Sequence, residues 1–328
     1  MIRIVIPLLL VLLLSTELYS QHSERDIEEI FSIGTVESVI IEKENRIVAE
    51  YYRGNMNQNS YVNIKSASKS VLSLLIGIAI EKGYIAGVDE PIGHYFPEYF
   101  DQNPDPKKES VTIKDLITMR SGLETTSFRN YGRWVLSHNW VNFALHQPMI
   151  EEPGGEMIYS TGTSHLLSVI ISRASGISTL QFANRYLFGP MDIRIGGWDR
   201  DPQGYHMGGN NMAMTPADML KIGRLMLNNG KYRDEQLIPP GWIQDSVEVY
   251  TRSNFNPYDY GYMWWRKKVQ NHEVVFAWGN GGQYIILLPE IDTTIIITSN
   301  LTNSGSRQYQ REIFQFLGDV LLPAINGS

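Results

Sequence analysis

The chain has 328 residues, contains no cysteine and carries a formal net charge of −7. The lack of cysteine excludes disulfides, thiolate metal sites and thiol catalysis, and the mildly acidic balance gives no reason to expect nucleic acid or an anionic membrane as a partner. A chain of this length can bury a large core without covalent cross-links.

The N-terminal segment predicts a secretory signal peptide. Arg3 precedes an apolar run from Ile4 to Leu14, and Ser20 is a small residue before Gln21. This pattern is typical of a signal peptide cut after residue 20, with an uncleaved N-terminal anchor as the alternative. We therefore expect an exported protein, periplasmic or secreted, whose mature part is residues 21–328 and has no membrane segment.

The rest of the chain passes from strand-like to helix-like patterns and back. Residues 38–52 are rich in Val and Ile around a polar break, which predicts a β-hairpin. Helical segments are expected over 66–82, 113–119, 140–145, 164–175, 179–187 and 215–228. Strands are then expected over 262–268, 273–278, 283–288 and 293–298, followed by an amphipathic helix near 306–322.

This order of elements predicts an α+β fold. An antiparallel sheet would be built from both ends of the chain and flanked by helices, with an all-α lobe inserted into it. The α/β lobe would comprise about residues 30–65 and 232–328, and the helical lobe about residues 66–231. No repeat or linker divides them, so both lobes are expected to form one domain.

The tetrad Ser66-Ala67-Ser68-Lys69 precedes an apolar run over residues 71–80. A serine and a lysine three positions apart lie on one face of a helix, and the helix start favours developing negative charge. A buried lysine loses its proton more readily than an exposed one. The pair therefore predicts a nucleophile beside its own base, although a Ser-x-x-Lys tetrad is expected about once by chance in a chain of this composition.

Two later segments could complete such a site. Tyr159 follows a Pro-Gly-Gly turn and precedes a helix expected to begin near Thr163. Its phenol could act as a base if a lysine cation lowered its pKa, or relay a proton as a neutral group. The second segment, Ala277-Trp278-Gly279-Asn280-Gly281, lies between two expected strands, where glycines allow close approach of substrate to the backbone.

With these three elements in order, the chain resembles the serine β-lactamase and penicillin-binding-protein superfamily, and within it the class C-like esterases and 6-aminohexanoate-dimer hydrolases. The resemblance covers about residues 30–320. It also includes the framing segments Gly83-Tyr84-Ile85-Ala86-Gly87-Val88-Asp89-Glu90-Pro91, residues 113–123 and Met214-Thr215-Pro216-Ala217-Asp218-Met219.

The resemblance implies a role for each element of the site. Ser66 would be the acylated nucleophile, Lys69 its proton acceptor and Tyr159 the general base or relay. The backbone N–H groups of Ser66 and Asn280 would form an oxyanion hole, and the substrate pocket would include the residues around the third motif, Trp278, Gly279 and Gly281. No metal and no cofactor is implied.

Two departures from the family pattern bear on the substrate. Thr161 replaces the Asn of the Tyr-x-Asn motif, and Ala277 replaces the basic residue of the third motif, which helps to hold the substrate carboxylate in β-lactamases and D,D-peptidases. No counterpart of the class A deacylating glutamate loop is evident, although Glu151 and Glu152 lie nearby. We expect a small ester, amide or short peptide-like substrate, with a β-lactamase or D,D-peptidase as the alternative.

Three other functions were compared with the sequence: a Ser-His-Asp hydrolase, a metal-binding protein and a non-catalytic domain. A Ser-His-Asp hydrolase would need a Gly-x-Ser-x-Gly elbow, and none occurs. The histidines show no metal-binding spacing on the expected helices, and packing or surface roles are expected for His94, His138, His146 and His165. A non-catalytic binding or sensor domain would retain the same fold without turnover. The sequence does not define the oligomeric state.

Overall fold

The computed structural model describes residues 27–33, 35–300 and 307–327. The expected signal peptide and its cleavage point after Ser20 lie outside these residues. Among the described residues no single helix is long and apolar enough to cross a membrane; one bent pair, Thr161–Ser175 and Thr179–Phe188, meeting at 75°, has the length and composition.

The sheet confirms the prediction that both ends of the chain build it. Its eight strands lie in the order β2-β1-β13-β12-β11-β10-β9-β8, and every pairing is antiparallel. The strands are β1 (Val36–Lys43), β2 (Arg46–Tyr52), β8 (Thr251–Arg252), β9 (Asp259–Tyr260), β10 (Trp265–Val269), β11 (His272–Gly279), β12 (Gln283–Leu288) and β13 (Thr293–Ser299).

Two neighbouring interior strands of the sheet are buried along their whole length. Every residue of β12 and β13 is buried, which requires cover on both faces of the sheet. On one face α10 (Pro216–Leu227) packs so closely on β13 that a Cβ at Gly223 would lie 2.4 Å from Thr294 Cγ2. On the other, Phe314 of α12 (Arg307–Phe316) contacts the rings of Phe276 and Tyr284.

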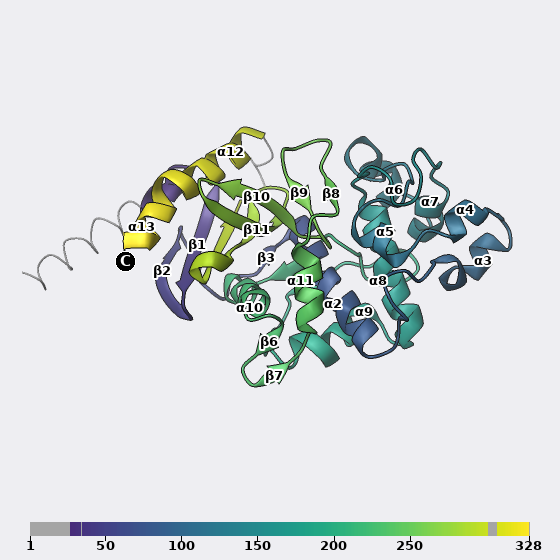
Figure 1. Ribbon diagram of the computed structural model, residues 1–328, viewed down its shortest axis with the longest axis horizontal. Helices are drawn as coiled ribbons and strands as arrows, with labels where there is room; N and C mark the ends of the chain where they lie inside the picture. The colour runs from purple at the N-terminus through teal and green to yellow at the C-terminus, as the bar shows by residue number, and fades with distance from the viewer. Residues whose placement is uncertain (1–26, 34, 301–306, 328) are drawn as a thin grey trace, which may run out of the picture.

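The helical lobe lies beside the sheet (Figure 1). Its longest helices are α2 (Ser68–Glu81) and α8 (Thr161–Ser175), which pack against each other. Around them are α3 (Pro97–Phe100), α4 (Pro106–Glu109), α5 (Ile113–Ile117), α6 (Tyr131–Val135), α7 (Trp140–Leu145), α9 (Thr179–Ala183) with its π-helical continuation η5 (Asn184–Phe188), and the 3₁₀ turns η3 (Gly93–Tyr95) and η4 (Phe128–Asn130).

The remaining elements connect or cap these layers. They are the helices α11 (Pro240–Val247) and α13 (Leu322–Gly327), the π-helical segment η7 (Leu317–Leu321) that joins α12 to α13, the 3₁₀ turns η1 (Glu29–Ser32), η2 (Lys65–Ala67) and η6 (Pro289–Ile291), and the short strands β3 (Val62–Asn63), β4 (Gly197–Trp198), β5 (Met212–Met214), β6 (Lys231–Tyr232) and β7 (Glu235–Gln236). The strands β3, β5 and β4 form a small second sheet in that order.

Three differences from the sequence-based expectation have an identifiable physical cause. Helix α10 falls in the range expected for the helical lobe, yet it packs on the large sheet because its small and apolar face fits β12 and β13. Helix α8 begins at Thr161, two residues before the expected start, because Ser160 accepts a hydrogen bond from the Thr163 N–H and caps it. Strand β10 begins at Trp265 rather than 262, since Met263 has a φ of 62° and interrupts the extended backbone.

Candidate active site

Ser66 lies in the turn η2, immediately before the buried helix α2. The Ser68 hydroxyl donates to the Lys65 carbonyl at 2.8 Å, and Lys65 itself has a φ of 50°. This tight entry leaves Ser66 partly exposed while Lys69, one turn further on, is buried. The nucleophile expected from the sequence therefore lies at the surface of a pocket, and its partner lysine lies beneath it.

The Lys69 amine is surrounded by three oxygen atoms. Its Nζ lies 3.3 Å from Ser66 Oγ, 3.3 Å from Thr161 Oγ1 and 2.6 Å from the Gly209 carbonyl oxygen. Burial lowers the pKa of Lys69 to about 7, since desolvation disfavours the ammonium form. Near neutral pH a large share of the amine is therefore unprotonated.

A neutral amine in this position would be oriented by its hydrogen bonds. It carries two hydrogens and one lone pair. If the hydrogens are donated to the Gly209 carbonyl and the Thr161 hydroxyl, the lone pair is directed toward the hydroxyl hydrogen of Ser66. Thr161, at the position where the resemblance led us to expect an asparagine, places its hydroxyl 3.3 Å from Lys69 Nζ and 3.0 Å from Ser127 Oγ.

Tyr159 lies on the other side of Ser66. Both residues line the same pocket, and Lys69 Nζ lies 5.1 Å from the centre of the Tyr159 ring. Trp265 stacks against the ring at 5.8 Å and Phe255 meets it edge-on at 5.6 Å. Burial raises the pKa of Tyr159 to about 12, against a smaller opposite effect of the nearby Ser66 hydroxyl, so the phenol is neutral at physiological pH.

The third motif runs along the end of β11 and lies against Ser66. A Cβ at Gly279 would lie 2.1 Å from the carbonyl oxygen of Ile64, so only glycine allows β11 to lie this close to η2. Gly281 follows in the left-handed region, with a φ of 93°. Among the described residues, neither the Ser66 N–H nor the Asn280 N–H has a protein acceptor, and both residues line one pocket.

That pocket has a volume of about 350 Å³ and an uncharged lining. It is lined by aromatic rings and by small polar groups, and the residues are Ser66, Ser127, Phe128, Tyr131, Tyr159, Thr161, Asn210, Phe255, Trp278 and Asn280. Ala277, which stands where the family has a basic residue, is fully buried. Glu151 and Glu152 are exposed, neither lines the pocket, and Glu152 pairs with Lys107 instead.

Sequence reasoning placed Ser66, Lys69, Tyr159, Trp278 and Asn280 near one another, and the structure brings them together. The sequence did not predict that Ser127, Phe128, Tyr131, Asn210 and Phe255 line the pocket. It also did not predict Gly209, whose carbonyl accepts a hydrogen bond from Lys69. The run Gly208-Gly209-Asn210-Asn211 was the available signal, because such residues tolerate left-handed backbone at close approaches.

A metal is not indicated by the side chains. Within the described ranges no group of three or more His, Asp or Glu side chains could hold a metal ion.

An antiparallel sheet flanked by helices, with Ser66 and Lys69 at the start of the helix between sheet and helical lobe, defines the β-lactamase/transpeptidase-like fold. A family model described as Beta-lactamase matches residues 33–317, and the chain belongs to this family.

The relatives include enzymes named as hydrolases. The chain is 22% identical over 307 residues to a 6-aminohexanoate-dimer hydrolase of Paenarthrobacter ureafaciens, covering 87% of this chain and 77% of the relative. A putative 6-aminohexanoate-dimer hydrolase from Bacillus anthracis superposes with a TM-score of 0.76 at 17% identity, over 92% of this chain and 81% of that one. EstCE1, described as a hydrolase with promiscuous acyltransferase activity, superposes with a TM-score of 0.72 at 16% identity, over 93% of this chain and 98% of that one.

Proposed function

We propose that the protein is an exported serine hydrolase that cleaves an ester or amide through an acyl-enzyme intermediate on Ser66. One observation carries this proposal: a buried Lys69 amine, with a pKa lowered to about 7, lies 3.3 Å from Ser66 Oγ. A base with a pKa near the working pH is well suited to remove the proton of a nucleophile. A purely structural lysine would gain nothing from this burial.

In the proposed reaction Ser66 Oγ attacks the carbonyl carbon and its proton passes to Lys69. The N–H groups of Ser66 and Asn280 donate to the substrate oxygen as negative charge builds on it. The bond to the leaving alcohol or amine then breaks, and the leaving group takes the proton from Lys69 by way of Tyr159. A water molecule then attacks the acyl carbon and gives its proton to Lys69 by way of Tyr159. The bond from Ser66 Oγ to that carbon breaks, Ser66 Oγ takes the proton back from Lys69, and the acid is released.

Of the two roles considered for Tyr159, the neutral relay is the better supported. A phenol with a pKa of about 12 is not ionised in the resting enzyme near pH 7. It can donate its hydrogen to a leaving group while accepting one from Lys69 or Ser66. We propose that Lys69 is the base and that Tyr159 carries the proton between it and the leaving group.

The substrate class follows from the pocket. Its uncharged lining and the buried Ala277 offer no cation to a substrate carboxylate in the position where the family has one. The relatives named as a 6-aminohexanoate-dimer hydrolase and as a hydrolase with acyltransferase activity point the same way. We propose a carboxylesterase or an amidase resembling the 6-aminohexanoate-dimer hydrolases, acting on small molecules.

The test is covalent labelling of Ser66. A fluorophosphonate should add one mass increment to the intact protein and none to a Ser66→Ala variant. No adduct at any pH from 6 to 9 would overturn the hydrolase proposal and favour a binding or sensor domain. Short-chain p-nitrophenyl esters should be cleaved faster than nitrocefin, and rapid nitrocefin hydrolysis would favour a β-lactamase instead.

Export is a separate proposal, and it is supported by the signal-peptide pattern of residues 1–20. Mass spectrometry of the protein recovered from its natural compartment should give an N-terminus at Gln21. A peptide containing Met1 in that material would contradict cleavage.

A further inference from the structure

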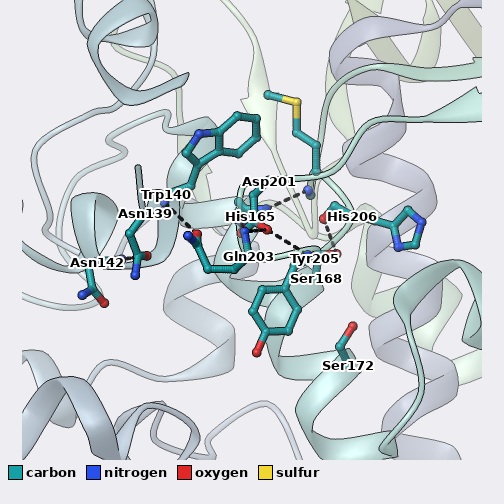
Figure 2. Close-up of polar contacts among 12 residues, drawn as sticks. Asn139, Trp140, Asn142, His165, Ser168, Ser172, Asp201, Gln203, Tyr205 and His206 are labelled. Atoms are coloured by element: carbon teal, nitrogen blue, oxygen red, sulfur yellow. Dashed lines mark hydrogen bonds and ion pairs between the residues drawn. The ribbon is translucent and has the colours of Figure 1, made fainter. Parts of the chain in front are cut away.

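A second polar cluster lies in the helical lobe outside the pocket lining, and none of its side chains was given a role in the reaction proposed above. His165 of α8 and Asp201 are both fully buried, and His165 Nε2 lies 2.9 Å from Asp201 Oδ2. Figure 2 shows these two side chains together with Gln203, Tyr205 and Trp140. Burying polar groups is energetically unfavourable unless all of their hydrogen bonds are made, so the burial of this pair requires an explanation.

The hydrogen bonds of this pair fix the tautomer of the histidine. His165 Nδ1 accepts from the Gly208 N–H at 3.2 Å, so Nε2 carries the hydrogen and donates it to Asp201. The other carboxylate oxygen, Oδ1, accepts from the N–H groups of Gln203 and Tyr205 at 2.9 and 2.8 Å. The pair thus ties α8 to the loop over residues 201–208 at two places.

The same helix fixes the Gly208 peptide from a second direction. Ser164 Oγ donates to the Gly208 carbonyl at 2.8 Å, so both polar groups of Gly208 are held by α8. A Cβ at Gly208 would lie 2.4 Å from the Ser164 carbonyl oxygen, which shows how closely the loop lies on the helix. Ser168 extends the attachment by donating to the His206 carbonyl at 2.7 Å (Figure 2).

The next residue, Gly209, is the one that contacts Lys69. It has a φ of +89°, and a Cβ there would lie 2.4 Å from Lys69 Cγ. Its carbonyl accepts from Lys69 at 2.6 Å, the shortest of the three contacts of that amine. The direction of this carbonyl determines where one hydrogen of the amine points, and therefore where its lone pair points.

We infer that the buried His165–Asp201 pair is a positioning device, which fixes the Gly208–Gly209 backbone so that the Gly209 carbonyl orients the Lys69 amine toward Ser66. Trp134 and Trp140 pack on the imidazole, with ring centres at 5.8 and 5.6 Å, and exclude water from the pair. The inference rests on the proposed function, since it assigns Lys69 the role of base.

The most direct variant is Asp201→Asn, which keeps size and removes charge. An amide NH2 facing His165 Nε2 would force the imidazole hydrogen onto Nδ1, opposite the Gly208 N–H. The reverse amide orientation would place NH2 against the N–H groups of Gln203 and Tyr205. In either case a donor faces a donor, and the Gly208 peptide should move.

We expect D201N to lower the rate constant for fluorophosphonate labelling of Ser66 by about tenfold to a hundredfold, as small misplacements of reacting groups do, with KM for a p-nitrophenyl ester nearly unchanged. The pH midpoint of labelling should also fall, because the Lys69 ammonium loses a hydrogen bond that favours it. Tyr159 is the titratable side chain in contact with Lys69, and D201N leaves it unaltered.

The matched control is Glu42→Gln. Glu42 of β1 is also a buried carboxylate, it pairs with Arg224 of α10, and it does not line the pocket. E42Q should lower the melting temperature without changing the labelling rate of the folded protein. If D201N behaves like E42Q, with an unchanged rate and midpoint, the pair is only structural and the inference is wrong.

A second variant covers the case in which D201N does not fold. His165→Asn can retain an acceptor for the Gly208 N–H while giving up Asp201, and it should label faster than His165→Leu, which retains neither. Equal rates for the two variants would overturn the inference. If the wild-type protein is not labelled by the fluorophosphonate at all, both the proposed function and the inference are wrong. If the wild type and D201N are labelled at the same rate, only the inference is wrong.

Discussion

Gly279 lies against Ile64 with no room for a side chain, because a Cβ on Gly279 would approach the Ile64 carbonyl oxygen to 2.1 Å. This contact holds the end of β11 beside η2, and Ser66 and Asn280, which adjoin the two contacting residues, line the same pocket. The geometry of the proposed oxyanion hole therefore depends on the absence of one methyl group.

Gly279→Ala should consequently separate the two N–H groups. Loss of one oxyanion donor typically lowers kcat by about 10²–10³, and we expect a decrease of this size in the hydrolysis of a p-nitrophenyl ester. Gly87→Ala is the control, since a Cβ there meets nothing within 4 Å. Near-normal kcat for a folded G279A protein would show that Asn280 does not serve as a donor.

The acylation rate should depend on the protonation of Lys69. Burial lowers the pKa of this amine to about 7, so the neutral form and the rate should increase as pH rises through about 7 and level off above it. The measurement is the rate of fluorophosphonate labelling from pH 5 to 9. A midpoint near 10, the pKa of an exposed lysine, would contradict the assignment of Lys69 as base.

The relay role of Tyr159 predicts a dependence on the leaving group. Tyr159→Phe should lower kcat by about a hundredfold, within the usual range for acid–base catalysis, for an alkyl ester that needs a proton to leave. The decrease should be much smaller for a p-nitrophenyl ester, whose leaving group is stable as an anion. Tyr260→Phe is the control, because Tyr260 is a buried neighbour outside the pocket lining. Equal losses for both esters would exclude a relay to the leaving group.

Phe128 should contribute to substrate preference. It lines the pocket with 61% of its surface exposed, and its ring lies 5.3 Å from that of Phe255. Aromatic contacts are worth about 0.5–1.5 kcal/mol, so Phe128→Ala should lower kcat/KM for a hexanoyl or benzoyl ester by about three- to tenfold and leave the acetyl ester unchanged. Leu136→Ala, an exposed apolar residue outside the pocket, should change neither. An equal loss on the acetyl ester would argue against acyl-group recognition by Phe128.

The sequence predicted the regular part of the fold well, because its signals are local. Strand β12 and helix α7 have the expected limits, since continuous apolar runs and an Asn cap define them. The exact start of α8 was less predictable. The residues at its start are small and polar, and the Ser160 side chain that caps it also accepts from the Thr126 N–H, which is distant in the sequence.

The site was predictable where its residues follow one another along the chain and not where the fold supplies them. Ser66 in η2 and Lys69 at the start of α2 are three residues apart on continuous helical backbone, so their proximity follows from the spacing. The carbonyl of Gly209 contacts Lys69, and the rings of Phe128 and Phe255 line the pocket, from three segments that are distant in the sequence. No local pattern relates such segments to each other, and only the tertiary arrangement brings them together. The pKa of Tyr159 likewise follows from neighbours that are distant in sequence.

The pairing of β1 with β13, which joins Lys43 to Thr293 at one end and Val36 to Ser299 at the other, has a consequence for the order in which the molecule can assemble. During synthesis β1 cannot pair with β13 until nearly all of the remaining chain has been made and has left the ribosome. Contacts so distant in sequence close late and slow folding. The hairpin of β1 and β2 would meanwhile expose an unpaired, apolar edge, so we expect a newly made chain to depend on chaperones until its last strand arrives.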